Sequence, residues 1–213
     1  MPFILLFFDF NVFNKEALMM KRIFAATAVA VLIVFGAYAQ NIGTFKDSRD
    51  GKTYKTVKVG GKTWMAENLN FAADGSKCYK NSAGNCEKYG RLYNWATALK
   101  ACPAGFHLPS DDEWTALENA VGGKDIAGTK LKSAAGWNED SNGTNDFGWS
   151  ALPGGLGGSG GDFGFAGNYG FWWSATEYDA NYAWYRNMFY YSGYVYGYYD
   201  GKTGLFSVRC VAN

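Results

Sequence analysis

Four cysteines constrain the fold of this chain more than any other feature: Cys78, Cys86, Cys102 and Cys210. They follow a segment typical of exported proteins, and in oxidising compartments cysteines of this kind pair as disulfides. Metal ligation is the alternative, but the sequence has no C-x-x-C spacing and a single histidine, His107. We therefore expect two disulfides and no metal site. Spacing alone leaves all three ways of pairing the cysteines open.

The export signal begins at Met20. From there the chain reads MKRIFAATAVAVLIVFGAYAQ, with a basic start, an apolar run and an A-x-A site before Gln40. The apolar run is shorter than the roughly 20 residues that cross a bilayer. We predict that Met20 is the true start, that residues 1–39 are an upstream segment plus signal peptide, and that cleavage precedes Gln40. Residues 40–213 then form one domain, secreted or at the cell surface, with no stable membrane insertion.

Charge excludes one class of partner. Residues 40–213 carry equal numbers of basic and acidic side chains. Nucleic-acid binding depends on many contacts from Lys and Arg to phosphate, so we expect no nucleic-acid partner.

The first part of the domain contains a predicted hairpin and a predicted helix. Residues 52–59 and 62–65 are rich in β-formers and flank Gly60-Gly61, so the domain is expected to open with a β-hairpin. A helix is predicted next, ending at Cys102-Pro103. Its apolar stripe, at the spacing i, i+3, i+4, i+7, is Leu92, Trp95, Ala96 and Leu99.

The stretch ACPAGFHLPSDDEW, residues 101–114, combines a cysteine, His107 and three carboxylates. A helix start explains the carboxylates: Ser110 and Glu113 form an S-x-x-E capping box, and the two aspartates between them lie where the helix dipole favours negative charge. The helix is predicted to end at Gly122-Gly123. Its buried stripe is Trp114, Leu117 and Val121. We expect His107 to pack in the core and hydrogen-bond to backbone.

The second half of the domain is predicted to be a sheet. Residues 148–170 hold ten glycines, which predicts a long loop region crossing the surface. Four runs rich in aromatic or β-branched residues follow, separated by turn residues, and they predict antiparallel strands. They read GFWWSATEYD, NYAWYRNMFYY, SGYVYGYYDG and LFSVRCV.

Taken together, an opening hairpin, two amphipathic helices, a glycine-rich region and a terminal strand with a cysteine resemble the C-type lectin-like fold. The chain is also similar, over residues 45–212, to the Fibrobacter succinogenes major paralogous domain. That similarity lies in the segments DGKTYKTVKVGGKTWMAENLNF, YGRLYNWATALKACPAGFHLPSDDEWTALE, GWSALPGG, GFWWSATE and FSVRCV.

These resemblances imply an α+β domain of an exported bacterial protein, with two helices packed on a twisted antiparallel sheet and long glycine-rich loops. The family has no established catalytic activity. The lectin-like fold ties the end of its first helix to its last strand, which implies a Cys102–Cys210 pair and leaves Cys78 with Cys86.

The candidate site is the aromatic sheet, because residues 171–200 hold fourteen aromatic side chains, more than one buried face needs. Side chains alternate along a strand. With Tyr185 and Phe189 inward, the residues expected to face solvent are Tyr182, Trp184, Arg186 and Tyr190. The resemblance to lectin-like proteins places the ligand face in the same region. The predicted ligand-binding residues are Trp173, Tyr178, Tyr182, Trp184, Arg186, Tyr190, Tyr194 and Tyr196.

Aromatic residues with a polar group suit protein interfaces and stacking on sugar rings. The predicted function is therefore non-catalytic recognition of a glycan or a surface protein. Tyrosines that merely fill a β-rich core are the alternative reading of the same residues. A purely structural module of a surface assembly is a further one.

An enzyme is the other alternative. GFHLPSDDEW resembles a segment of formylglycine-generating enzymes, but those carry a closely placed cysteine pair late in the chain, and Cys210 stands alone. A glycosidase needs two carboxylates at a set distance, and the candidates are Glu67, Asp146, Glu177, Asp179 and Asp200. Residues 138–146 offer oxygen ligands of the kind calcium favours, although we expect a solvated loop there and no cofactor.

Overall fold

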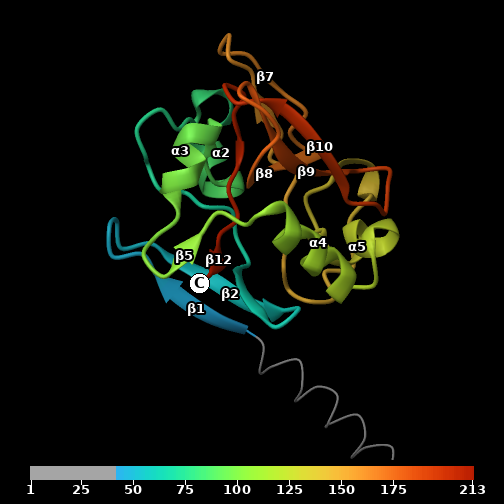
Figure 1. The fold of residues 1–213 in the computed structure, drawn as a ribbon. Helices are drawn as coiled ribbons and strands as arrows, with labels where there is room; N and C mark the ends of the chain where they lie inside the picture. The colour runs from blue at the N-terminus through green and yellow to red at the C-terminus, as the bar shows by residue number, and fades with distance from the viewer. Residues whose placement is uncertain (1–41) are drawn as a thin grey trace, which may run out of the picture. The chain divides into compact units, whose positions relative to one another are not determined.

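Two five-stranded sheets and one two-stranded ribbon organise residues 42–213, the part of the chain that the computed structural model describes (Figure 1). The fold is α+β, as predicted. The predicted signal peptide and the residues before it lie outside the described part. Within residues 42–213, no helix has the length and apolarity needed to cross a membrane.

The first sheet has the strand order β1-β2-β3-β12-β5. Its strands are β1 (Ile42–Lys46), β2 (Thr53–Val59), β3 (Lys62–Met65), β12 (Val211–Ala212) and β5 (Phe106–His107). The β2–β3 hairpin turns at Gly60-Gly61, as predicted, and both glycines have a positive φ. The domain does not open with this hairpin, because β1 precedes it and pairs antiparallel with β2. Strand β1 is an edge strand with mainly exposed side chains, so no buried apolar run marks it in the sequence.

The second sheet has the order β10-β9-β8-β11-β4. Its strands are β10 (Tyr196–Gly201), β9 (Tyr182–Phe189), β8 (Tyr169–Glu177), β11 (Phe206–Ser207) and β4 (Leu92–Tyr93). The antiparallel sheet predicted for the C-terminal runs is confirmed for β8, β9 and β10. The last run behaves differently: β11 pairs parallel with β8, and β12 crosses into the first sheet.

Helices cover both faces of the second sheet. Helix α3 (Trp95–Ala101) packs against β8 on one side, and α4 (Asp111–Ala120) packs against β8 and β9 on the other. Figure 1 shows α4 and α5 together, on the side of β9 away from α2 and α3. The remaining elements are α2 (Ala83–Tyr89), α5 (Lys124–Leu131), the 3-10 turns η1 (Tyr79–Asn81) and η2 (Asn138–Asp140), and the ribbon β6 (Leu156–Gly157) with β7 (Phe163–Gly164). Sequence patterns predicted two helices, so α2 and α5 were missed.

Helix α3 begins later than its predicted stripe. Leu92 belongs to β4, and the helix starts after Asn94, whose side chain accepts a hydrogen bond from the Thr97 N–H. The buried positions are Ala98 and Ala101, and Leu99 is exposed. The predicted stripe was wrong because Leu92 is buried by strand pairing rather than by a helix face.

Helix α4 confirms its predicted start. Ser110 and Glu113 form the capping box, and the buried stripe is Trp114, Leu117 and Val121. His107 is not a core residue, because its side chain is partly exposed. Its ring nitrogens contact the side chains of Asn213 at 2.7 Å and Glu113 at 3.0 Å instead of backbone. Asn213 follows β12, which pairs with β5, and Glu113 lies in the first turn of α4.

Glu113 makes further contacts besides those of the capping box. Its carboxylate accepts from the Lys62 ammonium at 2.7 Å, from the Ser110 N–H at 2.9 Å and from His107. Burial alone would raise the pKa of this carboxyl, but those three hydrogen bonds outweigh it and lower the pKa to about 2. The carboxylate is therefore ionised under ordinary conditions and joins β3 to the start of α4.

A tryptophan cluster fills the core on the α4 side. Its rings lie at tilted or edge-to-face angles, with neighbouring centroids 5.4 to 6.3 Å apart. The members are Trp64, Trp114, Trp149 and Trp172, all fully buried. Trp149 comes from the glycine-rich region, where Ala151 is also fully buried. The prediction that residues 148–170 only cross the surface was therefore wrong, since the first part of this region is core.

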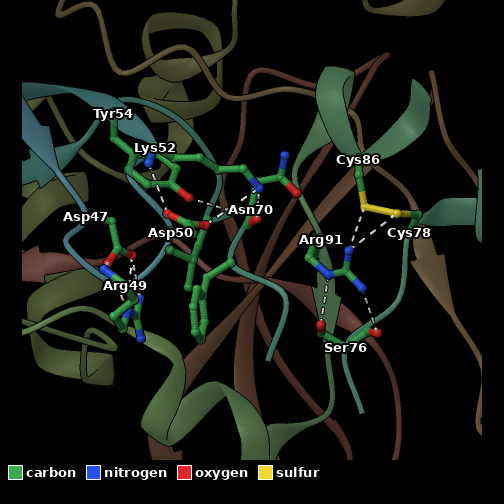
Figure 2. A network of polar contacts seen from close by, with 12 residues as sticks. Asp47, Arg49, Asp50, Lys52, Tyr54, Asn70, Ser76, Cys78, Cys86 and Arg91 are labelled. Carbon is green, nitrogen blue, oxygen red and sulfur yellow. Dashed lines mark hydrogen bonds and ion pairs between the residues drawn. A yellow bond between two sulfur atoms is a disulfide. The ribbon is translucent and has the colours of Figure 1, made fainter. Parts of the chain in front are cut away.

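Both disulfides implied by the resemblance are present. Cys102, at the end of α3, is bonded to Cys210, and Cys78 is bonded to Cys86 on α2. Arg91 lies against the second disulfide, with Nη1 at 3.7 Å from the Cys78 sulfur and 3.6 Å from the Cys86 sulfur (Figure 2). Within residues 42–213, every cysteine is paired.

Candidate recognition surface

The register of the second sheet assigns each aromatic side chain to a face. Residues opposite one another in antiparallel strands share a face. Trp173 pairs with Tyr185, and Tyr185 pairs with Tyr198, so these three lie on the face that α3 partly covers, here called the α3 face. Trp172 pairs with Arg186, and both lie on the opposite, α4 face.

Arg186 does not face solvent as predicted. It is buried under α4, where Nε donates to Glu118 Oε1 at 2.7 Å and Nη1 donates to Asp111 Oδ1. Gly197 lies opposite on β10, and a Cβ there would come within 3.0 Å of Nη1. Alternation along β9 was predicted correctly, but the sequence did not show that the acidic start of α4 covers this face.

The pKa values of Arg186 and Glu118 are both raised. Burial would lower the pKa of Arg186, but its bonds to Asp111 and Glu118 outweigh burial and raise it. Burial raises the pKa of Glu118 despite the bond from Arg186. Arg186 therefore joins β9 to α4 and is not available to a ligand.

Trp173 is also removed from the predicted surface. Its side chain is fully buried, stacks on Phe206 with ring centroids 4.3 Å apart and donates from Nε1 to the Tyr93 carbonyl at 2.7 Å. A ring so enclosed is core. The sequence signal was ambiguous because every position from 171 to 173 is aromatic, and all three prove to be buried.

Three of the predicted ligand-binding residues do come together in an exposed cluster. It lies on the α4 face, in the part of the sheet that α4 does not cover. We call it the Tyr178 cluster, and its members are Tyr178, Tyr182, Trp184 and Tyr199. The rings of Tyr178 and Tyr199 stack with centroids 3.8 Å apart, and Trp184 meets Tyr199 edge-on at 5.8 Å. All but Trp184 are exposed. Tyr199 was not predicted, although its cross-strand pairing with Trp184 places it there.

A longer group of rings lies on the α3 face. We call it the aromatic strip, and its members are Phe165, Tyr169, Phe189, Tyr191, Tyr194, Tyr196 and Tyr198. Phe165, Tyr191, Tyr194 and Tyr198 are exposed. Tyr194, Tyr196 and Tyr198 follow one another along the chain with nearly parallel rings, 5.6 and 6.1 Å between centroids. Only Tyr194 and Tyr196 were predicted.

Tyr190 belongs to neither surface fully. It follows the end of β9, is half-buried, and packs against the core cluster that includes Trp172. The solvent exposure predicted for it is therefore only partial, because its ring packs on the core of the α4 face.

The turn that carries Tyr191 and Tyr194 is held by α5. The Thr129 N–H donates to the Gly193 carbonyl at 3.2 Å, and the Val195 N–H donates to the Lys124 carbonyl at 2.9 Å. Gly128 allows this approach, since a Cβ there would lie 2.7 Å from the Gly193 oxygen. The backbone under the strip is therefore anchored on a helix.

A buried lysine holds the same turn from within. Lys132 is 4% exposed, and its ammonium donates to the carbonyls of Tyr190 at 3.1 Å and Ser192 at 3.2 Å. Burial lowers its pKa. Since these bonds satisfy main-chain acceptors that would otherwise be buried, they fix the turn. The strip is thus preorganised, which reduces the entropy lost when a ligand binds.

Three of the carboxylates considered for an enzyme have hydrogen-bond or ion-pair partners within the fold. Glu177 is ion-paired with Lys202, and Asp179 accepts the backbone N–H groups of Asn181 and Tyr182 in its own turn. Glu67 accepts from the Lys55 N–H on the first sheet. Within residues 42–213, no three His, Cys, Asp or Glu side chains gather closely enough to hold a metal ion.

Two amide oxygens of the loop considered for calcium are used within the fold. Asn142 Oδ1 accepts from the Trp137 N–H at 3.1 Å, and Asn145 Oδ1 accepts from the Ser150 N–H at 2.8 Å. These bonds shape the loop that leads to Trp149.

A separate pocket of about 360 Å³ lies between β2, the chain that follows β3, and α2. Lys52 lines it and donates from Nζ to the Asn70 carbonyl at 2.6 Å, while the Asn70 N–H donates to the Tyr54 hydroxyl at 3.1 Å (Figure 2). Beside it, Arg49 is paired with Asp47 at 2.6 Å. Burial raises the pKa of Tyr54 to about 12. These groups satisfy one another and tie β2 to the chain after β3.

Fold and surface together define a disulfide-linked α+β domain whose C-terminal sheet exposes aromatic rings on both faces. Residues 57–212 match the model of one family, the Fibrobacter succinogenes major domain. This chain belongs to that family. Comparison with curated proteins gives no match, and comparison with solved structures gives none either.

Proposed function

We propose that this domain is an exported, non-catalytic recognition module with a C-type lectin-like fold, which binds a polysaccharide or a surface protein outside the cell. The observation that carries the proposal is the aromatic strip. Four of its rings are exposed and its turn is anchored on α5. Large contiguous apolar surfaces are uncommon on monomeric proteins and mark interaction sites.

Other features support the proposal. Two disulfides suit an oxidising, extracytoplasmic compartment. Tyrosine presents a rigid ring and a hydroxyl together, which gives contact area at low entropic cost. The Tyr178 cluster offers a second, smaller aromatic surface on the opposite face of the same sheet.

The test compares a double variant of the strip with a control of matched exposure. Tyr191→Ala with Tyr198→Ala removes two exposed rings, and Ile42→Ala removes an equally exposed apolar side chain from β1. Binding is measured by affinity electrophoresis and calorimetry against plant and cell-wall polysaccharides and against surface proteins. Each ring is expected to contribute about threefold to tenfold in affinity.

Loss of binding in the double variant but not in Ile42→Ala supports the proposal. Equal binding by all three proteins, with intact circular dichroism, would show that the strip is not the ligand face. Turnover of any polysaccharide that Glu177→Gln abolishes would favour an enzyme instead.

A further inference from the structure

Asn187 lies in the middle of the aromatic face. It is on β9, on the α3 face, between Tyr185 and Phe189 of the same strand. Directly opposite are Phe171 on β8 and Tyr196 on β10. The nearest side chains along the strand and across it on this face are therefore aromatic, and Asn187 is only 2% exposed.

The carboxamide oxygen of Asn187 is not used by the fold. Its Oδ1 is buried and has no hydrogen-bond partner among residues 42–213. A buried acceptor without a partner destabilises the folded state, whereas an apolar side chain of the same shape would not. Asn68, another buried asparagine, shows the usual arrangement, because its Oδ1 accepts from both Trp172 and Arg209. Buried polar groups without a partner are few in native structures, and each of them calls for an explanation.

Tyr196 is the cross-strand neighbour of Asn187 on β10. This tyrosine is on the edge strand β10 and is only partly buried. Its hydroxyl is within hydrogen-bond distance of the Ser192 hydroxyl, at 3.0 Å. Because Asn187 is buried, a ligand reaches Oδ1 only when a neighbouring side chain moves, and Tyr196, on the edge strand, is a partly buried neighbour.

We propose that Asn187 is the polar anchor of a carbohydrate site on the aromatic strip, in which a sugar hydroxyl donates to Oδ1. With the Tyr196 ring displaced, the exposed rings of Tyr194 and Tyr198 on either side of it offer stacking surfaces to the apolar faces of sugar units. The inference rests on the proposed function and selects the ligand class. A polysaccharide supplies a hydroxyl donor together with an apolar ring face, and the site offers the complement of both.

The charge of the site favours a neutral sugar. Arg186, on the same strand, is committed to Glu118 and Asp111 on the opposite face. Lys132, beneath the adjoining turn, donates to backbone carbonyls and is buried. Neither cation is available to a carboxylate or sulfate on the ligand.

The test is Asn187→Leu, which keeps the size and removes the amide. Wild type, Asn187→Leu and Tyr198→Ala are titrated with soluble neutral polysaccharides, namely cello-oligosaccharides, xylan and mannan. We expect Asn187→Leu to weaken binding about tenfold and to leave the urea midpoint unchanged or higher. In wild type, the Asn187 side-chain amide signals should shift in ¹H–¹⁵N spectra when sugar is added.

The outcomes separate the two proposals. If Tyr198→Ala loses binding and Asn187→Leu does not, the strip binds sugar but the anchor is wrong. If neither variant changes binding, both proposals fail. A marked fall in the urea midpoint of Asn187→Leu would show a structural amide and overturn the inference. Binding of a surface protein with no affinity for any of the neutral polysaccharides would overturn the carbohydrate site while leaving the recognition module standing.

Discussion

Replacement of each disulfide by a pair of alanines should reveal how unequally the two bonds stabilise this domain. In the loop-closure description, the entropy removed from the unfolded chain grows with the logarithm of the loop length. Cys102–Cys210 spans 108 residues, which gives about 4.8 kcal/mol at 25 °C, and Cys78–Cys86 spans 8 residues, which gives about 2.5 kcal/mol.

The two pairs make a matched comparison. Each joins one buried cysteine, Cys210 or Cys86, to one half-buried cysteine. The loss of packing is therefore similar, and the difference of about 2.3 kcal/mol reports loop closure.

Urea unfolding followed by tryptophan fluorescence measures this difference. With a slope of about 2 kcal/mol per molar urea, the midpoint of Cys102→Ala/Cys210→Ala should lie about 1 M below that of Cys78→Ala/Cys86→Ala. Equal midpoints, or a lower one for the short-loop variant, would refute the reasoning and show that local contacts around Arg91 and α2 outweigh chain entropy.

Two further substitutions test the polar contacts. The pKa of Glu113 is lower in the folded than in the unfolded protein, so its contribution to the free energy of unfolding is complete above the unfolded value near 4.5 and is lost as the pH falls toward about 2. In Glu113→Gln, the urea midpoint should therefore depend less on pH across that range. The same dependence on pH as in wild type would contradict this. Arg186→Ala leaves the Glu118 carboxylate buried without its partner, which should cost about 3–5 kcal/mol in urea unfolding; a cost below about 1 kcal/mol would show that Glu118 is satisfied by water.

Local signals in the sequence predicted local structure well. The capping box of Ser110 and Glu113 and the Gly60-Gly61 turn involve residues within three positions of each other, so a short segment contains the whole cause. The predicted buried stripe of helix α3 was wrong because Leu92 is buried by its pairing with Ser207, more than one hundred positions away. Such a contact leaves no periodic trace beside Trp95.

For the candidate site too, local patterns were predicted correctly and contacts with distant elements were not. Alternation predicted correctly that Tyr182 and Trp184 share a face and that aromatic rings remain exposed. It could not show which elements cover each face, so Arg186 and Trp173 were assigned to the surface although α4 and Phe206 enclose them. The disulfide pairing came from the resemblance to the C-type lectin-like fold, because the spacing of the cysteines leaves all three pairings open.

The anchoring of the turn beneath the strip has a consequence for sequence change. The Thr129 N–H and the Lys132 ammonium hold this turn by donating to its backbone carbonyls. Tyr191 and Tyr194 on its outer side contribute no side chain to those bonds. Exchange of these two side chains should therefore alter what the surface contacts while the domain keeps its stability. The domain separates the residues that specify its shape from those that specify its partner, and one scaffold can present many different surfaces.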